Sequence, residues 1–205
     1  MFSLNKTFLL IIFIFITSCA TPSLTYREGF VPSSAHVYIS ESNKLPGKGL
    51  IHMYWNDETE ILNKNASSWT GSAASMNIPL GKITKLISLK VYDQMFKDGV
   101  SFSNEIEAGY TLVISPKIKS LDYYYDQLSN AGFAITPKVE LSASFRVFDN
   151  KGIKVFSEQY SSGMVEGDTY FLNTSPSEAI NEVIHVAIHQ VISESFNDIL
   201  RLKLN

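Results

Sequence analysis

The sequence has a single cysteine, Cys19, among its 205 residues. One thiol excludes an internal disulfide, a CxxC redox pair and a zinc site built from several thiolates. The folded part of the chain must therefore be stabilised by its hydrophobic core, without covalent cross-links.

Charge of either sign is also sparse. The chain holds 17 lysines and arginines against 20 aspartates and glutamates, which gives a formal net charge of −3. A mildly acidic chain without a basic cluster is a poor match for nucleic acid or for an anionic lipid surface. We therefore expect no nucleic-acid partner.

Motifs for catalysis and cofactor binding are missing as well. The sequence contains no Gly-x-Ser-x-Gly elbow, no phosphate-binding loop and no dinucleotide fingerprint. We predict a protein that is not an enzyme, with no catalytic residue and no cofactor.

The N-terminus carries an apolar run that is too short to span a bilayer. Phe8 to Ile16 are nine consecutive apolar residues behind Lys6, whereas a spanning helix needs roughly 20. This pattern is typical of a signal peptide. The residues that follow, Ile16-Thr17-Ser18-Cys19, resemble a bacterial lipobox. We interpret residues 1–18 as a signal peptide and Cys19 as the lipidated first residue of the mature chain, with an ordinary signal peptide or an uncleaved anchor as alternatives.

The remaining chain divides into a tether and one domain. Residues 19–34 include two prolines and show no hydrophobic period, so we predict a flexible tether behind the lipidated cysteine. Residues 35–205 have the length of a single domain, which we expect to be periplasmic. Membrane attachment would then come from acyl chains on Cys19.

Hydrophobic periodicity predicts five strands and two helices in the domain. Apolar residues alternate in the strands and recur at three- and four-residue spacing in the helices. The predicted strands cover 36–40, 49–55, 110–120, 133–147 and 153–161, and the helices begin at Pro79 and after Ser175. The stretch 57–75 is polar and is predicted to be a long loop. The order favours an α+β two-layer sandwich, with a mainly antiparallel sheet of four to five strands and two helices on one face.

The last hundred residues or so carry a series of recognisable segments. They are the strand Tyr110-Thr-Leu-Val-Ile-Ser, the strand Val139-Glu-Leu-Ser-Ala-Ser-Phe-Arg-Val, a return strand ending in Gln159-Tyr160-Ser161, a link through Gly167 and Phe171, and a helix start at Ala179-Ile180-Asn181. With the lipobox, they resemble the YajG-like family of bacterial lipoproteins and, more loosely, the auxiliary lipoproteins of ABC-type envelope lipid transporters. The resemblance implies an outer-membrane lipoprotein whose domain faces the periplasm, and it carries over no catalytic residue.

One group of residues has the spacing of metal ligands. Glu182, His185 and His189 are three and four residues apart, which places them on one side of the last predicted helix. That side is opposite the apolar stripe, and no further ligand is evident. We therefore interpret the three residues as a solvated helix face and predict no metal site, while His36 and His52 are interpreted as residues at the edge of the core.

Three consecutive tyrosines, Tyr123, Tyr124 and Tyr125, close the strand that begins at Tyr110. Side chains alternate between the two faces of a strand, so at least one ring should be exposed. Because exposed aromatic residues are typical anchors for partners, we predict a partner-binding surface here. The alternative is that the rings pack on the edge of the sheet.

These observations favour a lipoprotein that is anchored in the bacterial outer membrane and acts by binding. We expect envelope protein partners, as for an accessory subunit of an envelope transport or assembly system. A hydrolase acting on envelope material and a surface-exposed or secretion-associated lipoprotein are the alternatives.

Overall fold

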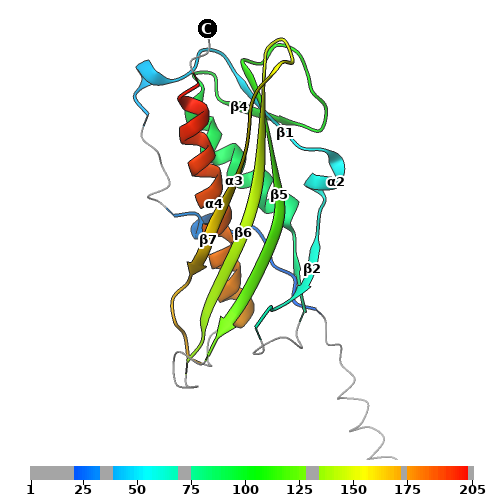
Figure 1. Ribbon diagram of the computed structural model, residues 1–205, viewed down its shortest axis with the longest axis vertical. Coiled ribbons are helices and arrows are strands. Elements are labelled where there is room, and N and C mark those ends of the chain that lie inside the picture. Colours follow the sequence, from blue (N-terminus) through cyan, green and yellow to red (C-terminus); the bar gives the residue numbers. More distant parts are fainter. Residues whose placement is uncertain (1–20, 33–38, 69–74, 128–133, 172–174, 203–205) are drawn as a thin grey trace, which may run out of the picture.

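A five-stranded mixed sheet forms one layer of the molecule (Figure 1). The computed structural model describes residues 21–32, 39–68, 75–127, 134–171 and 175–202. The strands lie in the order β4-β1-β5-β6-β7. Their bounds are β1 (Gly49–His52), β4 (Val100–Ser103), β5 (Leu112–Asp126), β6 (Thr136–Asp149) and β7 (Lys154–Glu166).

Three long antiparallel strands make up most of this sheet. β6 pairs with β5 on one side and β7 on the other, whereas the short β1 runs parallel to both β4 and β5. The antiparallel meander follows from short turns such as Asp149 to Ile153, where the Asp149 carboxylate accepts hydrogen bonds from the backbone N–H groups of Lys151 and Ile153.

Two helices form the second layer, on one face of the sheet (Figure 1). They are α3 (Leu80–Tyr92), continued by the 3₁₀ turn η4 (Asp93–Met95), and α4 (Pro176–Leu200). Their apolar faces and the inward side chains of the sheet make one hydrophobic core. The α+β two-layer arrangement is therefore confirmed, with five strands in the main sheet. No helix in the described ranges is both long enough and apolar enough to cross a membrane.

The predicted loop 57–75 contains regular structure instead. The helical turn α2 (Trp55–Glu58) follows β1, and β2 (Leu62–Asn65) pairs antiparallel with β3 (Ser75–Ile78) in a separate two-stranded sheet. The strand predicted at 49–55 ends early because Trp55 begins α2. β4 was not predicted at all, since its partly exposed residues show no clear apolar face. The predicted strand at 36–40 lies mainly outside the described residues, and Ile39 and Ser40 are not in a strand.

The segment predicted as a flexible tether is packed on the domain where it is described. Residues 21–32 include the 3₁₀ turn η1 (Glu28–Phe30), and Leu24 and Val31 are buried in the core. A second short turn, η3 (Glu41–Asn43), precedes β1. The folded part of the chain thus begins well before residue 35.

Candidate binding groove

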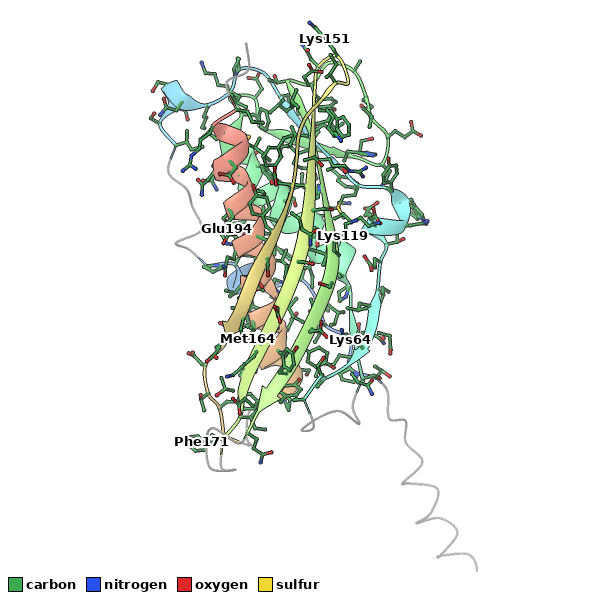
Figure 2. All side chains as sticks on the ribbon, in the orientation of Figure 1. Lys64, Lys119, Lys151, Met164, Phe171 and Glu194 are labelled. Atoms are coloured by element: carbon green, nitrogen blue, oxygen red, sulfur yellow. The ribbon has the colours of Figure 1, made fainter. Side chains whose placement is uncertain are left out.

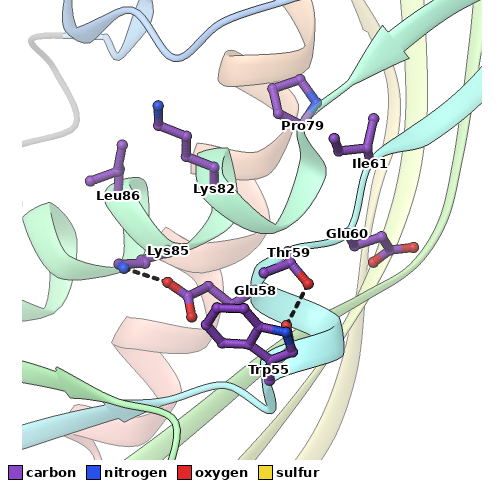
Figure 3. A pocket seen from close by; sticks show the side chains of 9 residues that line it. All are labelled: Trp55, Glu58, Thr59, Glu60, Ile61, Pro79, Lys82, Lys85 and Leu86. Carbon is purple, nitrogen blue, oxygen red and sulfur yellow. Dashed lines mark hydrogen bonds and ion pairs between the residues drawn. The ribbon is translucent and has the colours of Figure 1, made fainter.

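A groove lies between α2 and the first two turns of α3, with a volume of about 410 Å³ (Figure 3). We call it the α2–α3 groove. Its lining residues are Trp55, Glu58, Thr59, Glu60, Ile61, Pro79, Lys82, Lys85 and Leu86. Apolar atoms make up most of its lining, so it suits an apolar group better than a small polar ligand.

Close backbone packing fixes the floor of the groove. Gly81, in the first turn of α3, lies where a Cβ atom would come 2.1 Å from the carbonyl oxygen of Asp57 and 2.2 Å from that of Glu58. The Gly81 N–H also donates to the carbonyl oxygen of Glu60 at 3.2 Å. Only glycine lets the end of α2 lie this close to α3.

Side-chain contacts also fix the position of α2. Lys85 forms an ion pair with Glu58 (Figure 3), and the Asn104 side-chain amide donates to the other Glu58 oxygen at 2.7 Å and to the Met53 carbonyl at 2.9 Å. The Lys85 ammonium also lies 3.9 Å from the centre of the Phe102 ring. The groove is therefore preformed on fixed elements.

The two carboxyl groups of the groove differ in their electrostatic setting. The hydrogen bond from Lys85 lowers the pKa of the Glu58 carboxyl, against the effect of burial, and the bond from Asn104 lowers it further. Burial raises the pKa of the Glu60 carboxyl, and the nearby Asp57 charge raises it further, against the effect of Lys117. Glu58 is thus a structural anion, whereas Glu60 is held in surroundings that disfavour its charge.

The rim of the groove exposes large apolar side chains. Trp55 is 65% exposed and Ile61 is 64% exposed, although both residue types are usually buried at least in part. Lys82 also lines the groove, and its ammonium group forms no ion pair or hydrogen bond within the described part of the chain. An apolar surface beside a free cation can accept an apolar group that carries or neighbours a negative charge.

The tyrosine cluster is mostly buried, which corrects its prediction as a partner-binding surface. Tyr123 and Tyr125 are core residues, and only Tyr124 is partly exposed. The Tyr123 hydroxyl donates to the Lys64 carbonyl at 2.8 Å, and the Tyr125 hydroxyl donates to the Pro176 carbonyl at 3.1 Å. These partners lie in β2 and at the start of α4, so a surface role is left for Tyr124 alone.

The helix face with metal-ligand spacing is also different from the prediction. Glu182 is exposed, but His185 and His189 are buried, so the histidines are not part of a solvated face. His185 contacts the Asn181 carbonyl through Nδ1 at 2.8 Å and accepts a hydrogen bond from the Arg27 N–H at Nε2, at 3.0 Å. The N-terminal segment covers this side of α4. No group of three potential metal ligands occurs among the described residues.

Of the other predicted positions, the structure describes His52 but not Cys19 or His36. His52 is buried on β1, with neither ring nitrogen hydrogen-bonded in favourable geometry and its ring 5.0 Å from that of Tyr54. Cys19 and His36 lie outside the described residues, so lipidation at Cys19 stays a prediction. Sequence reasoning did not identify the groove. Its only signal was the presence of Trp55 and Ile61 within a polar stretch.

Comparison with known proteins places the fold. No family model matches the sequence, and no curated protein matches it either. Among solved structures, the chain is similar to a protein from Xanthomonas campestris described under family DUF330, with a TM-score of 0.52 and 10% sequence identity over 87% of this chain and 93% of that one. The two chains share a fold.

Lower similarity extends to other bacterial proteins. A protein from Helicobacter pylori, described as a homolog of a neuraminyllactose-binding hemagglutinin, gives a TM-score of 0.45 at 12% identity, covering 78% of this chain and 88% of that one. A minor lipoprotein from Acinetobacter baumannii gives a TM-score of 0.34 at 10% identity, covering 75% and 92%. The YajG-like resemblance itself stays a prediction.

Proposed function

We propose that this protein is a lipid-anchored envelope lipoprotein that acts by binding, as an accessory subunit of an envelope transport or assembly system. The observation that carries the proposal is the α2–α3 groove, where Trp55 and Ile61 are exposed beside a preformed apolar cavity. Exposed aromatic and aliphatic residues at a concave site are typical of protein docking. The lipobox at Cys19 supports the anchoring part of the proposal.

The chemistry of the groove favours, as its partner, a protein segment with an apolar side chain next to a carboxylate. The apolar side chain would fill the space between Trp55 and Leu86, and the carboxylate would meet Lys82. Lys85 is unsuited to that second role because it is already paired with Glu58. A charged pair at the rim contributes mainly to specificity, while the apolar contact contributes most of the affinity.

Among the described residues, no arrangement supports the hydrolase as a second function. Such an enzyme would need a serine or carboxylate brought to a histidine in a pocket. The groove is lined by Glu58 and Glu60 but by no histidine. The Ser193 hydroxyl lies 3.2 Å from the His189 ring, but the two residues are one turn apart on α4, outside the groove.

Site-specific photocrosslinking in cells tests the proposal. A photoreactive amino acid at position 61 should give a discrete adduct with an envelope protein, and Trp55→Ala should reduce its yield strongly, since loss of a hot-spot tryptophan weakens binding by about 2 kcal/mol or more, about 30-fold. Lys82→Glu should reduce it as well. The matched control is position 153, because Ile153 is similarly exposed (59%) but lies at the β6–β7 turn. Equal adducts from positions 61 and 153, or adducts insensitive to both substitutions, would contradict the groove as the binding site.

A further inference from the structure

Residues 21–32 form a strap that is fixed to the domain at its very beginning. The Asn77 N–H of β3 donates to the Pro22 carbonyl at 3.0 Å, and the Leu24 N–H donates to the Asn77 carbonyl at 2.9 Å. Ser23 and Asn77 form a parallel bridge. The chain is therefore attached to the β2–β3 sheet from residue 22 onwards.

Contacts with the helices hold the rest of the strap. The Asn181 side-chain amide donates to the Thr25 carbonyl at 3.0 Å, and the Arg27 N–H donates to His185 Nε2. Two ion pairs, Arg27 with Glu178 and Lys90 with Glu28, lie at its surface. Because the strap combines backbone bonds, buried apolar side chains and a buried histidine, it is part of the folded domain and not a free linker.

The strap limits the distance between Cys19 and the domain. Only Ala20 and Thr21 separate Cys19 from Pro22. Three residue steps span at most about 11 Å even when fully extended. An acyl-modified Cys19 at a bilayer surface would therefore keep the β2–β3 sheet close to that surface.

We propose that the end of the domain formed by β2 and β3 lies against the phospholipid bilayer, held there by the strap. This inference rests on the proposed lipid anchor. The described residues of β2 and β3 at this end include paired polar groups: Asn63 and Asn77 hydrogen-bond to each other, and Lys64 is paired with Asp122. This end can therefore approach lipid headgroups of either charge.

The orientation places the opposite end far from the membrane. Lys151, at the β6–β7 turn, and Phe171 mark opposite ends of the long axis, with Lys64 nearer to Phe171 (Figure 2). The 15-residue strand β5 runs along that axis and rises about 3.3 Å per residue, so its length is about 50 Å. The helical turn α2, which forms one wall of the α2–α3 groove, lies between the two ends at the side of the sheet (Figure 1). The groove would therefore face a partner standing beside this protein on the same membrane.

Fluorescence quenching in vesicles tests this orientation. Acylation consumes the thiol of the single native cysteine, so cysteines introduced by Asn65→Cys and Lys151→Cys in the lipidated protein can be labelled selectively with bimane. Vesicles carrying nitroxide-labelled headgroups should quench the label at position 65 and leave the label at position 151 unquenched. Equal quenching at both positions, or stronger quenching at 151, would overturn the proposal.

A linker insertion shows whether the strap is responsible. About 12 Gly and Ser residues between Ala20 and Thr21 add about 20 Å of average reach. Quenching at position 65 should fall while the protein still floats with the vesicles. Unchanged quenching would overturn the role of the strap. If the protein without the insertion does not float with the vesicles, both the proposed lipid anchor and the orientation are wrong. If it floats but the labels at positions 65 and 151 are quenched equally, only the orientation is wrong.

Discussion

At the scale of single residues, Gly81 determines how closely α2 approaches α3. Gly81→Ala would place a methyl group within 2.2 Å of two backbone carbonyl oxygens, which cannot move without displacing α2. Overpacking of this kind costs about 1–3 kcal/mol, so the variant should be less stable by that amount in urea unfolding and should lose groove binding. The matched control is Gly29→Ala, because no atom lies within 4 Å of its added methyl group. Equal stability of the two variants would show that α2 is not packed as described.

His185 makes stability depend on pH in a defined direction. Burial lowers the pKa of its imidazole below the ordinary value of 6.5, and the Arg27 charge lowers it too, while the bond with the Asn181 carbonyl raises it. The unfolded chain therefore takes up a proton near pH 6.5 that the folded chain does not. The contribution is fully present above pH 6.5, and the free energy of unfolding falls as the pH falls below it.

The measurement compares how steeply the free energy of unfolding changes with pH in two proteins, and not their absolute stabilities. Between pH 7 and pH 5, wild type should lose more free energy of unfolding than His185→Gln, measured by urea titration at each pH. His52, whose pKa burial also lowers, is present in both proteins and cancels in the comparison. Parallel slopes would mean that His185 is accessible to protons in the folded state.

At the scale of elements, one buried hydrogen bond joins α3 to α4. The Tyr92 hydroxyl lies 2.6 Å from the Ser195 hydroxyl, and Ser195 in turn donates to the Ile192 carbonyl at 2.8 Å. Loss of either hydroxyl has a different consequence for the hydrogen bonds that remain. Tyr92→Phe leaves the Ser195 hydroxyl with its carbonyl acceptor, whereas Ser195→Ala leaves the buried Tyr92 hydroxyl without a partner.

We therefore predict that the loss of the Ser195 hydroxyl destabilises the protein more than the loss of the Tyr92 hydroxyl. Tyr92→Phe should cost about 0.5–1.5 kcal/mol, and Ser195→Ala about 1–3 kcal/mol. Thermal unfolding of both variants and of the double variant checks this order. The double variant should be no less stable than Ser195→Ala alone, because it removes the unsatisfied hydroxyl. The reverse order would place a second partner, such as water, at the Tyr92 hydroxyl.

The long elements could be predicted from the sequence because their patterns are local. Alternation over Phe133 to Val147 and the serine, proline and glutamate that begin α4 each specify an element without distant contacts. The parallel pairing of β1 with β4 and β5 could not be predicted, since four-residue strands carry too little pattern to identify a partner.

The prediction for the tyrosine cluster was wrong for a related reason. The three tyrosines were predicted to form a partner-binding surface because side chains alternate along a strand, so that at least one ring should be exposed. In the structure, the Ser67 N–H donates to the Tyr123 carbonyl, and the Ser68 hydroxyl accepts from the Tyr125 N–H, so the segment after α2 runs along β5 beside these tyrosines. The same segment forms one wall of the groove. Burial at these positions is decided by contacts between residues more than fifty positions apart, which periodicity does not encode.

At the scale of the whole molecule, three features act together. The strap packs on the β2–β3 sheet, and the two-layer fold carries the groove on fixed elements. In the proposed function, the strap would set which end of the domain faces the lipid anchor, and the groove would offer Trp55, Ile61 and Lys82 to a partner. In the proposed function, such a protein would act by holding a binding surface at a defined place on a membrane. The proposed function and orientation both depend on one covalent event, the acylation of Cys19.

Replacement of that cysteine is therefore the most direct test. Cys19→Ala would remove the proposed acyl chains, which contribute about 0.8 kcal/mol per buried methylene, and would leave the packed residues from 21 onwards unchanged. The wild type should sediment with membranes after a high-salt wash and show an intact mass that begins at an acylated Cys19. The variant should be folded, with the melting temperature of the wild-type domain, and should not sediment with washed membranes. A folded variant that still sediments with washed membranes, or a wild-type mass without acyl groups, would contradict the account.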